Sequence, residues 1–236
     1  MQMKTSLVSK ILLFVLVLGL SSSCSKRTDW NMFGLRGEVK SYEETHFQPE
    51  KKGDSWEAGE KLEYGHSKVA FENTGEYTSM EFIYKDNSLL EKMVPERKGD
   101  KTTELRYDNE GNVVGRSEIE NVSDEQFTFV SYSDDGRKLS EGNTFFKNNA
   151  VIKQELEVFD SSGEVMDKIV VTFKYDKKGN LISQKQTNGN GDVPFYFQYK
   201  YLEYDAQNNW TKRLDYSQEG EPNIPERMAI RTYEYY

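Results

Sequence analysis

Residues 107–112 read Tyr-Asp-Asn-Glu-Gly-Asn, and variants of this stretch recur along the chain. Each variant places an aromatic residue four positions before a glycine, with polar residues between them. An Asp or Ser in the first polar position can accept a hydrogen bond from the amide two residues on, and glycine adopts a positive φ without a steric penalty. This combination is typical of a tight turn between antiparallel strands. The predicted turn glycines are Gly75, Gly111, Gly136, Gly163, Gly179 and Gly220.

Between the turns, the side chains alternate with a period of two. Along residues 195–201, the aromatic side chains at 195, 197, 199 and 201 share one face. Along residues 152–158, apolar side chains at 152, 156 and 158 oppose charged ones at 153, 155 and 157. Strands with one apolar and one charged face belong to antiparallel sheets with one side in water. Because no stretch after Cys24 sustains a helical period over three turns, we predict an all-β fold.

The order of the turns predicts an antiparallel β-meander of repeated hairpins, in which each strand pairs with the next. Beyond the N-terminal segment the apolar content is low, which favours one large twisted or curled sheet over a thick two-layer core. Open sheets of ten or more strands tend to curl or to split into two packed sheets, so a β-sandwich is the alternative.

The N-terminal segment has the pattern of a targeting sequence. Lys4 and Lys10 precede an apolar run at residues 11–20, and small residues lead to Cys24, the single cysteine of the chain. The apolar run would rise about 15 Å as a helix, half of a bilayer core. A secretory signal peptide is therefore expected rather than a membrane-spanning helix.

The position of this cysteine resembles the lipobox of bacterial lipoproteins, which implies that Cys24 is lipidated and becomes the first residue of the mature chain. An ordinary signal peptide followed by a chance cysteine is the alternative. We therefore predict a signal peptide at 1–23, a tether at 24–30 and a single β-repeat domain at 31–236.

Composition excludes several classes of protein. The formal net charge is -9. Proteins that bind nucleic acid need clustered Lys and Arg to contact the phosphates, so no nucleic-acid partner is expected. One cysteine and two histidines rule out a disulfide framework and leave little for a metal site, and no cofactor-binding motif is present.

No catalytic constellation is evident either. His46 and His66 lack an accompanying nucleophile motif, and we expect both to be surface residues. Paired acids such as Asp134 and Asp135 fit solvated turns better than glycoside hydrolysis, which needs two carboxyl groups at a defined separation. Trp56 and Trp210 are candidates for stacking against a ligand. The alternative is that they pack in the core of the sheet, where large aromatic side chains are usually found.

The Tyr-Asp-x-x-Gly-Asn copies at 107–112 and 175–180 resemble the YD repeats of Rhs-type bacterial surface proteins. The stretches at 35–42 and 209–213 are similar to those of uncharacterised Bacteroidota lipoproteins with such repeats. The resemblance implies an extracytoplasmic β-repeat module. Ser25, Lys26 and Arg27 follow Cys24 in place of the acidic run associated with surface display, so we expect the lipid on Cys24 to hold the module at the outer membrane, facing the periplasm. The expected function is non-catalytic, either structural or binding an envelope glycan or protein; a glycan hydrolase that uses paired carboxylates is the alternative.

Overall fold

The computed structural model describes residues 28–99, 101–217 and 223–236, which form a short helix, α2 (Asp29–Met32), and fifteen β-strands. The strands are β1 (Val39–Lys52), β2 (Ser55–Lys61), β3 (His66–Phe71), β4 (Tyr77–Ile83), β5 (Leu89–Lys98), β6 (Lys101–Tyr107), β7 (Val113–Ser123), β8 (Gln126–Ser133), β9 (Lys138–Lys147), β10 (Ala150–Phe159), β11 (Val165–Tyr175), β12 (Leu181–Asn188), β13 (Phe195–Tyr204), β14 (Trp210–Ser217) and β15 (Arg227–Tyr235). The predicted signal peptide, Cys24 and Gly220 lie outside the described residues.

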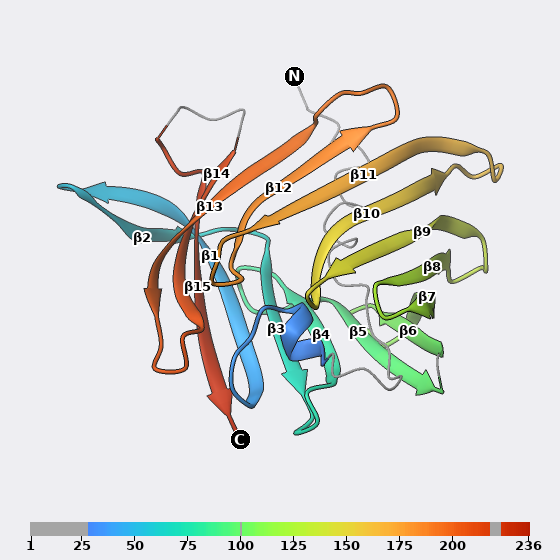
Figure 1. The fold of residues 1–236 in the computed structure, drawn as a ribbon, viewed down its shortest axis with the longest axis horizontal. Helices are drawn as coiled ribbons and strands as arrows, with labels where there is room; N and C mark the ends of the chain where they lie inside the picture. The colour runs from blue at the N-terminus through green and yellow to red at the C-terminus, as the bar shows by residue number, and fades with distance from the viewer. Residues whose placement is uncertain (1–27, 100, 218–222) are drawn as a thin grey trace.

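The strands close into a barrel (Figure 1). From β3 to β15 each strand pairs with its neighbours in sequence, and β1 pairs with both β3 and β15. The described residues thus form a closed ring of 14 antiparallel strands, from which β2 and the distal part of β1 project as a hairpin. The predicted all-β antiparallel meander is confirmed. The predicted twisted or curled sheet closes completely into a barrel, and the sandwich alternative is wrong, because pairing of β1 with β15 leaves no edge on the ring.

The repeated turns have the predicted backbone. In the turn at residues 107–112, the amides of Glu110 and Asn112 both donate to Oδ1 of Asp108 at 2.9 Å, and Gly111 has a φ of 85°. At the weaker copy without glycine, Asn208 takes a φ of 65°. A positive φ is confirmed for every predicted turn glycine that the structure describes, namely Gly75, Gly111, Gly136, Gly163 and Gly179.

The N-terminal segment, residues 28–38, crosses one end of the barrel. Because antiparallel strands alternate in direction, the turns that follow β3, β11 and β13 lie at this same end. The amide of Asp29 donates to the carbonyl of Gly75 at 3.0 Å, and the amide of Arg36 donates to Oδ1 of Asn209 at 2.8 Å. We call this end the capped end. Residues 28–30 therefore contact the barrel through Asp29 and Trp30, and the predicted tether at 24–30 stays a prediction.

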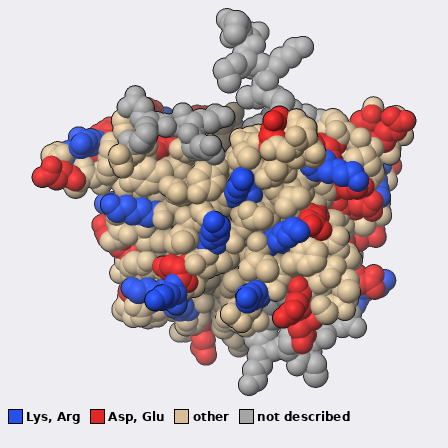
Figure 2. Space-filling model, turned by 45° about the horizontal axis from the view of Figure 1, so that its top comes forward, with Lys and Arg blue, Asp and Glu red and all other residues tan. Residues whose placement is uncertain are grey.

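The inner face of the barrel carries its apolar core, while charged pairs occupy the outer wall. One cluster of buried side chains includes Phe127 and Phe129, a second includes Tyr77 and Met93, and Met32 of α2 packs against both. Outward side chains form ion pairs such as those that join Lys153 to Glu155 and Arg116 to Glu118, and Figure 2 shows charges of both signs across one outer face. No helix in the described part of the chain is long and apolar enough to cross a membrane.

Candidate functional site

A cavity of about 430 Å³ lies inside the barrel. Its walls come from β1, β3, β4 and β10 to β15, and residues 31–34 of the N-terminal segment also contribute to it. Pockets that enclose small ligands measure roughly 300 to 1,000 Å³. The cavity is therefore large enough for a small organic molecule.

Asp215 on β14 organises the first part of a buried charge network beside the cavity. Its carboxylate, which is fully buried, accepts hydrogen bonds from Nε of Arg213 and Nε of Arg227, both at 2.6 Å. Burial alone would raise the pKa of Asp215, but the two guanidinium groups hold it below its ordinary value. Asp215 therefore remains an anion that holds two cations in place.

Glu44 forms the second part of the network, across the seam where the barrel closes. It lies opposite Arg231 in the pairing of β1 with β15, and Nε of Arg231 donates to its Oε2 at 2.6 Å. Nη2 of Arg213 is 3.5 Å from the other carboxylate oxygen. Burial would raise the pKa of Glu44, but Arg231 and Arg213 hold it well below its ordinary value. The network therefore joins three arginines to two carboxylates.

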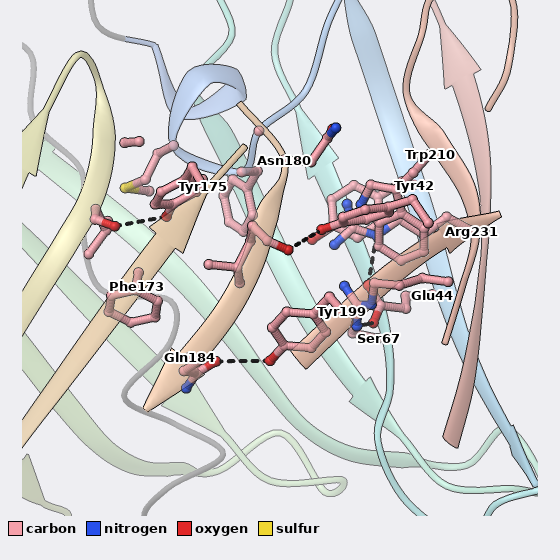
Figure 3. Close-up of a pocket in the computed structure, with 18 of the residues that line it drawn as sticks. Tyr42, Glu44, Ser67, Phe173, Tyr175, Asn180, Gln184, Tyr199, Trp210 and Arg231 are labelled. Carbon is pink, nitrogen blue, oxygen red and sulfur yellow. Dashed lines mark hydrogen bonds and ion pairs between the residues drawn. The ribbon is translucent and has the colours of Figure 1, made fainter. Parts of the chain in front are cut away.

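Aromatic rings cover the guanidinium groups of Arg213 and Arg231, and Figure 3 shows Tyr42 and Trp210 beside Arg231. The centre of a Trp210 ring is 4.2 Å from Cζ of Arg231 and 4.5 Å from Cζ of Arg213. Tyr42 lies 4.3 Å from Arg231, and Tyr199 lies 4.6 Å from Arg213. Each such contact contributes about 0.5 to 2 kcal/mol, more when it is desolvated. Because the rings occupy the guanidinium faces, any further hydrogen bonds must form in the guanidinium planes.

Both histidines are buried, so the prediction that they are surface residues is wrong. Nδ1 of His66 accepts from the amide of His46 at 3.0 Å, while its Nε2 donates to the carbonyl of Leu62 at 2.7 Å. His66 thus replaces a backbone partner where β1 and β3 diverge. His46 lines the cavity, and its Nε2 lies 2.7 Å from Glu44. Burial, together with the charge of Arg227, lowers the pKa of His46, so its ring is neutral.

The remaining cavity wall is apolar and amide-bearing. Phe173 and Tyr175 lie across the cavity from Arg231 in Figure 3. Gln154, which is 3% exposed, donates from Nε2 to Thr144 at 3.2 Å. Among the described residues, Oε1 of Gln154 has no hydrogen-bond partner. The cavity thus combines a cationic aromatic side with an apolar side that holds an unused acceptor.

A second acidic group lies inside the barrel and does not line the cavity. Glu104 on β6 is fully buried, and the hydroxyl of Tyr77 donates to its Oε2. Burial raises the pKa of Glu104 to about 7, against the opposing effects of Tyr77 and Arg106. Burial likewise raises the pKa of Glu91 to about 7. These carboxyl groups are protonated over part of the physiological pH range.

The structure separates the two tryptophans that the sequence singled out. Trp210 lines the cavity, whereas Trp56 is half-buried on the projecting strand β2, with Nζ of Lys51 6.0 Å from its ring. Ligand stacking by either residue remains a prediction. Within the described ranges, no group of three or more His, Cys, Asp or Glu side chains could hold a metal ion.

Sequence reasoning missed the arginines and carboxylates of the network. The signal was present in the period of β15, where Arg227 and Arg231 alternate onto the same face as Tyr233 and Tyr235. Charged residues in phase with aromatic residues on a strand indicate an inward polar cluster. The spacing of Arg213 and Asp215 on β14 carries the same signal.

Comparison with known proteins does not assign the chain to a family. No family model and no curated protein matches the sequence. Among solved structures, a porin-like protein from Bacteroides uniformis is similar with a TM-score of 0.43 and 10% identity, covering 84% of this chain and 98% of that one. A structure described as TcdB2-TccC3-TEV matches with a TM-score of 0.17 and 14% identity, covering 73% of this chain but 12% of that one. These likenesses assign no function, and the proposals below rest on the cavity and its charges.

Proposed function

We propose that this protein is a lipid-anchored binding module of the bacterial cell envelope, which holds a small ligand inside its barrel without catalysis. The observation that carries the proposal is the cavity of about 430 Å³, in which Arg213, Arg231 and Trp210 face an apolar wall. Charged and aromatic groups that converge on one concave pocket are typical of small-molecule sites.

The outer wall supports a barrel that sits in water and is attached to the membrane by its anchor. Lys or Arg on a lipid-facing barrel wall costs about 2 to 4 kcal/mol at the bilayer midplane. Here the outward positions of neighbouring strands carry ion pairs, including those of Lys92 with Glu81 and Lys168 with Glu157. If this wall faced lipid, as the outer wall of a membrane barrel does, it would need apolar side chains at these positions.

The N-terminal segment supports an orientation for the barrel. The described chain begins at Thr28, beside the capped end, and the predicted lipidated residue Cys24 is four residues earlier. Four residues span at most about 14 Å. An anchor at Cys24 would therefore hold the capped end against the membrane surface, which we place on the periplasmic side of the outer membrane.

The alternative of a glycan hydrolase gains no support from the cavity. Glycoside hydrolysis needs one carboxylic acid that is protonated at working pH, so its pKa must be raised. The carboxylates of the network, Glu44 and Asp215, have lowered pKa values because arginines surround them. Binding is therefore the better-supported role.

Substituting the anchor residue tests the location directly. In Cys24→Ala, the protein should leave the membrane fraction or accumulate as an unprocessed precursor, and metabolic fatty-acid labelling should disappear. The reason is that the chain contains no other cysteine to accept the lipid. The matched control Ser25→Ala should stay labelled. Labelling that persists in Cys24→Ala would refute the lipid anchor.

Filling the cavity tests the binding function. Ser67 lines the cavity from β3, opposite Glu44 on β1 and Phe82 on β4. In Ser67→Phe, a ring would occupy the space that the ligand needs. We expect the affinity for any ligand found by calorimetric screening of envelope small molecules against the full chain to fall at least about tenfold.

The control for this substitution is Thr172→Phe, which adds the same ring on the exposed outer side of β11. It should bind like the wild type. Saturable binding that Ser67→Phe leaves unchanged would place the ligand elsewhere. If the screen finds no saturable ligand at all, the binding role is wrong and a structural role replaces it.

A further inference from the structure

The charge balance of the cavity defines the ligand further, provided that the proposed binding function holds. Three guanidinium groups, those of Arg213, Arg227 and Arg231, share the carboxylates of Glu44 and Asp215. One positive charge is left over. Arg213 and Arg231 are largely buried, with side chains 10% and 11% exposed, and Arg227 is 25% exposed. A largely buried charge without a counterion is unfavourable, so the cavity favours an occupant with a single negative charge.

The arrangement of Arg231 leaves hydrogen-bonding capacity for such an occupant. Within the described part of the chain its Nε donates to Glu44, and the Tyr233 hydroxyl is a second hydrogen-bond partner of its side chain, which together use only part of its five N–H donors. Tyr42 and Trp210 cover the guanidinium group from its sides. A guanidinium group carries five N–H donors in one plane, and a carboxylate is the planar acceptor that matches them. An anion can therefore bind at the guanidinium edge without displacing Glu44.

The other side of the cavity requires an apolar body. Met80 and Phe82 on β4 and Phe173 on β11 line it and are buried. A small inorganic anion would leave these side chains in contact with empty space or with water. Gln154 in the same wall has a buried Oε1 without a hydrogen-bond partner among the described residues, which is an acceptor that a hydroxyl or amide on a ligand would satisfy.

From these contacts we infer that the cavity binds a monoanionic amphipathic organic acid, with its carboxylate at the edge of Arg231 and its apolar body against Phe82 and Phe173. A dianion such as a phosphate monoester is disfavoured, because the excess is one charge and the carboxylate of Glu44 is close by. A cation is repelled by the same excess. A neutral sugar would leave the positive charge uncompensated.

Three probes of matched shape test this inference: 6-phenylhexanoate, 6-phenylhexanol and 6-phenylhexylamine. Binding of each to the wild-type full chain in a non-ionic detergent would be measured by calorimetry. We expect the acid to bind about tenfold to a hundredfold more tightly than the alcohol, since a charge-assisted hydrogen bond is worth that factor. The amine should show no saturable binding. This comparison needs no variant that could fail to fold.

The substitution Arg231→Gln should reduce the affinity for the acid by about tenfold or more and leave the affinity for the alcohol unchanged. The matched control is Arg116→Gln, which removes an arginine that pairs with Glu118 on the outer wall. It should change neither affinity.

Each other outcome overturns the inference in a distinguishable way. Equal affinity for the acid and the alcohol would mean that the cavity binds apolar molecules and does not discriminate between them by charge. This result would contradict the inference but not the proposed binding function. Tighter binding of the amine would reverse the assigned charge. If none of the probes binds although the envelope screen finds a ligand that Ser67→Phe excludes, the ligand class is wrong and the proposed function survives.

Discussion

Replacing Asp215 with alanine should lower the free energy of unfolding by about 3 to 5 kcal/mol. Asp215 is fully buried and accepts hydrogen bonds from both Arg213 and Arg227. Its removal leaves the buried guanidinium group of Arg213 and the partly buried one of Arg227 without their main counterion, and their mutual repulsion is no longer offset. Because small domains are stable by only about 5 to 15 kcal/mol, this single change brings the barrel close to unfolding.

Urea denaturation at neutral pH measures this loss. The matched control is Glu118→Ala, which removes a half-exposed carboxylate paired with Arg116 on the outer wall, and a change within about 0.5 kcal/mol is expected there. A loss below about 1 kcal/mol for Asp215→Ala would mean that water reaches the network and that the cavity is not an enclosed, charge-selective site.

The second large effect concerns Glu104 and depends on pH. Its pKa rises from 4.5 in the unfolded chain to about 7 in the barrel, so between these values the folded protein keeps a proton that the unfolded chain has released. The resulting cost is absent below pH 4.5, grows through the window and is complete above pH 7. At 1.36 kcal/mol per pKa unit it reaches about 3 kcal/mol. Glutamine has no proton to lose, so Glu104→Gln should gain up to this amount relative to the wild type between pH 5 and pH 8.

The difference between variant and wild type is the informative quantity, because the histidines act in the opposite direction. The pKa values of His46 and His66 are lowered by burial, so their contribution to stability increases as the pH rises towards 6.5. Both proteins retain the histidines and Glu91, so these contributions largely cancel in the difference. Urea denaturation at pH 5 and pH 8 provides the four values required. A difference that does not change with pH would show that Glu104 is not buried as described.

The local elements of this fold could be predicted from the sequence, whereas the closure of the barrel could not. The turn at Gly111 follows from residues within six positions, because both its hydrogen bonds and its φ are local. The seam joins Glu44 to Arg231, which are 187 residues apart, and no periodicity reports such a pairing. The sequence also predicts which side chains of a strand point into the barrel and which point outwards, except where a β-bulge shifts the alternation. A register shift between Val151 and Lys153 turns Ile152 outwards, although the sequence placed it on the face of Leu156.

The candidate site was predictable only in part, for a related reason. Trp210 could be singled out as a candidate because the chain has only three tryptophans. The roles of Glu44 and Arg213 depend on which strands become neighbours: Glu44 meets Arg231 only because β1 pairs with β15. Arginine and glutamate on strands usually indicate a solvated face, and that statistical preference hides an inward network.

Native mass spectrometry of the full chain, purified in a non-ionic detergent from the cells that produce it, tests the central claim most directly. The wild type should carry one small organic acid, which is released on unfolding, and the same preparation of Ser67→Phe should carry none, while Thr172→Phe retains it. An identical small-molecule content in the wild type and in Ser67→Phe, or a bound molecule that is cationic, would contradict the account of the barrel interior as an anion-binding site.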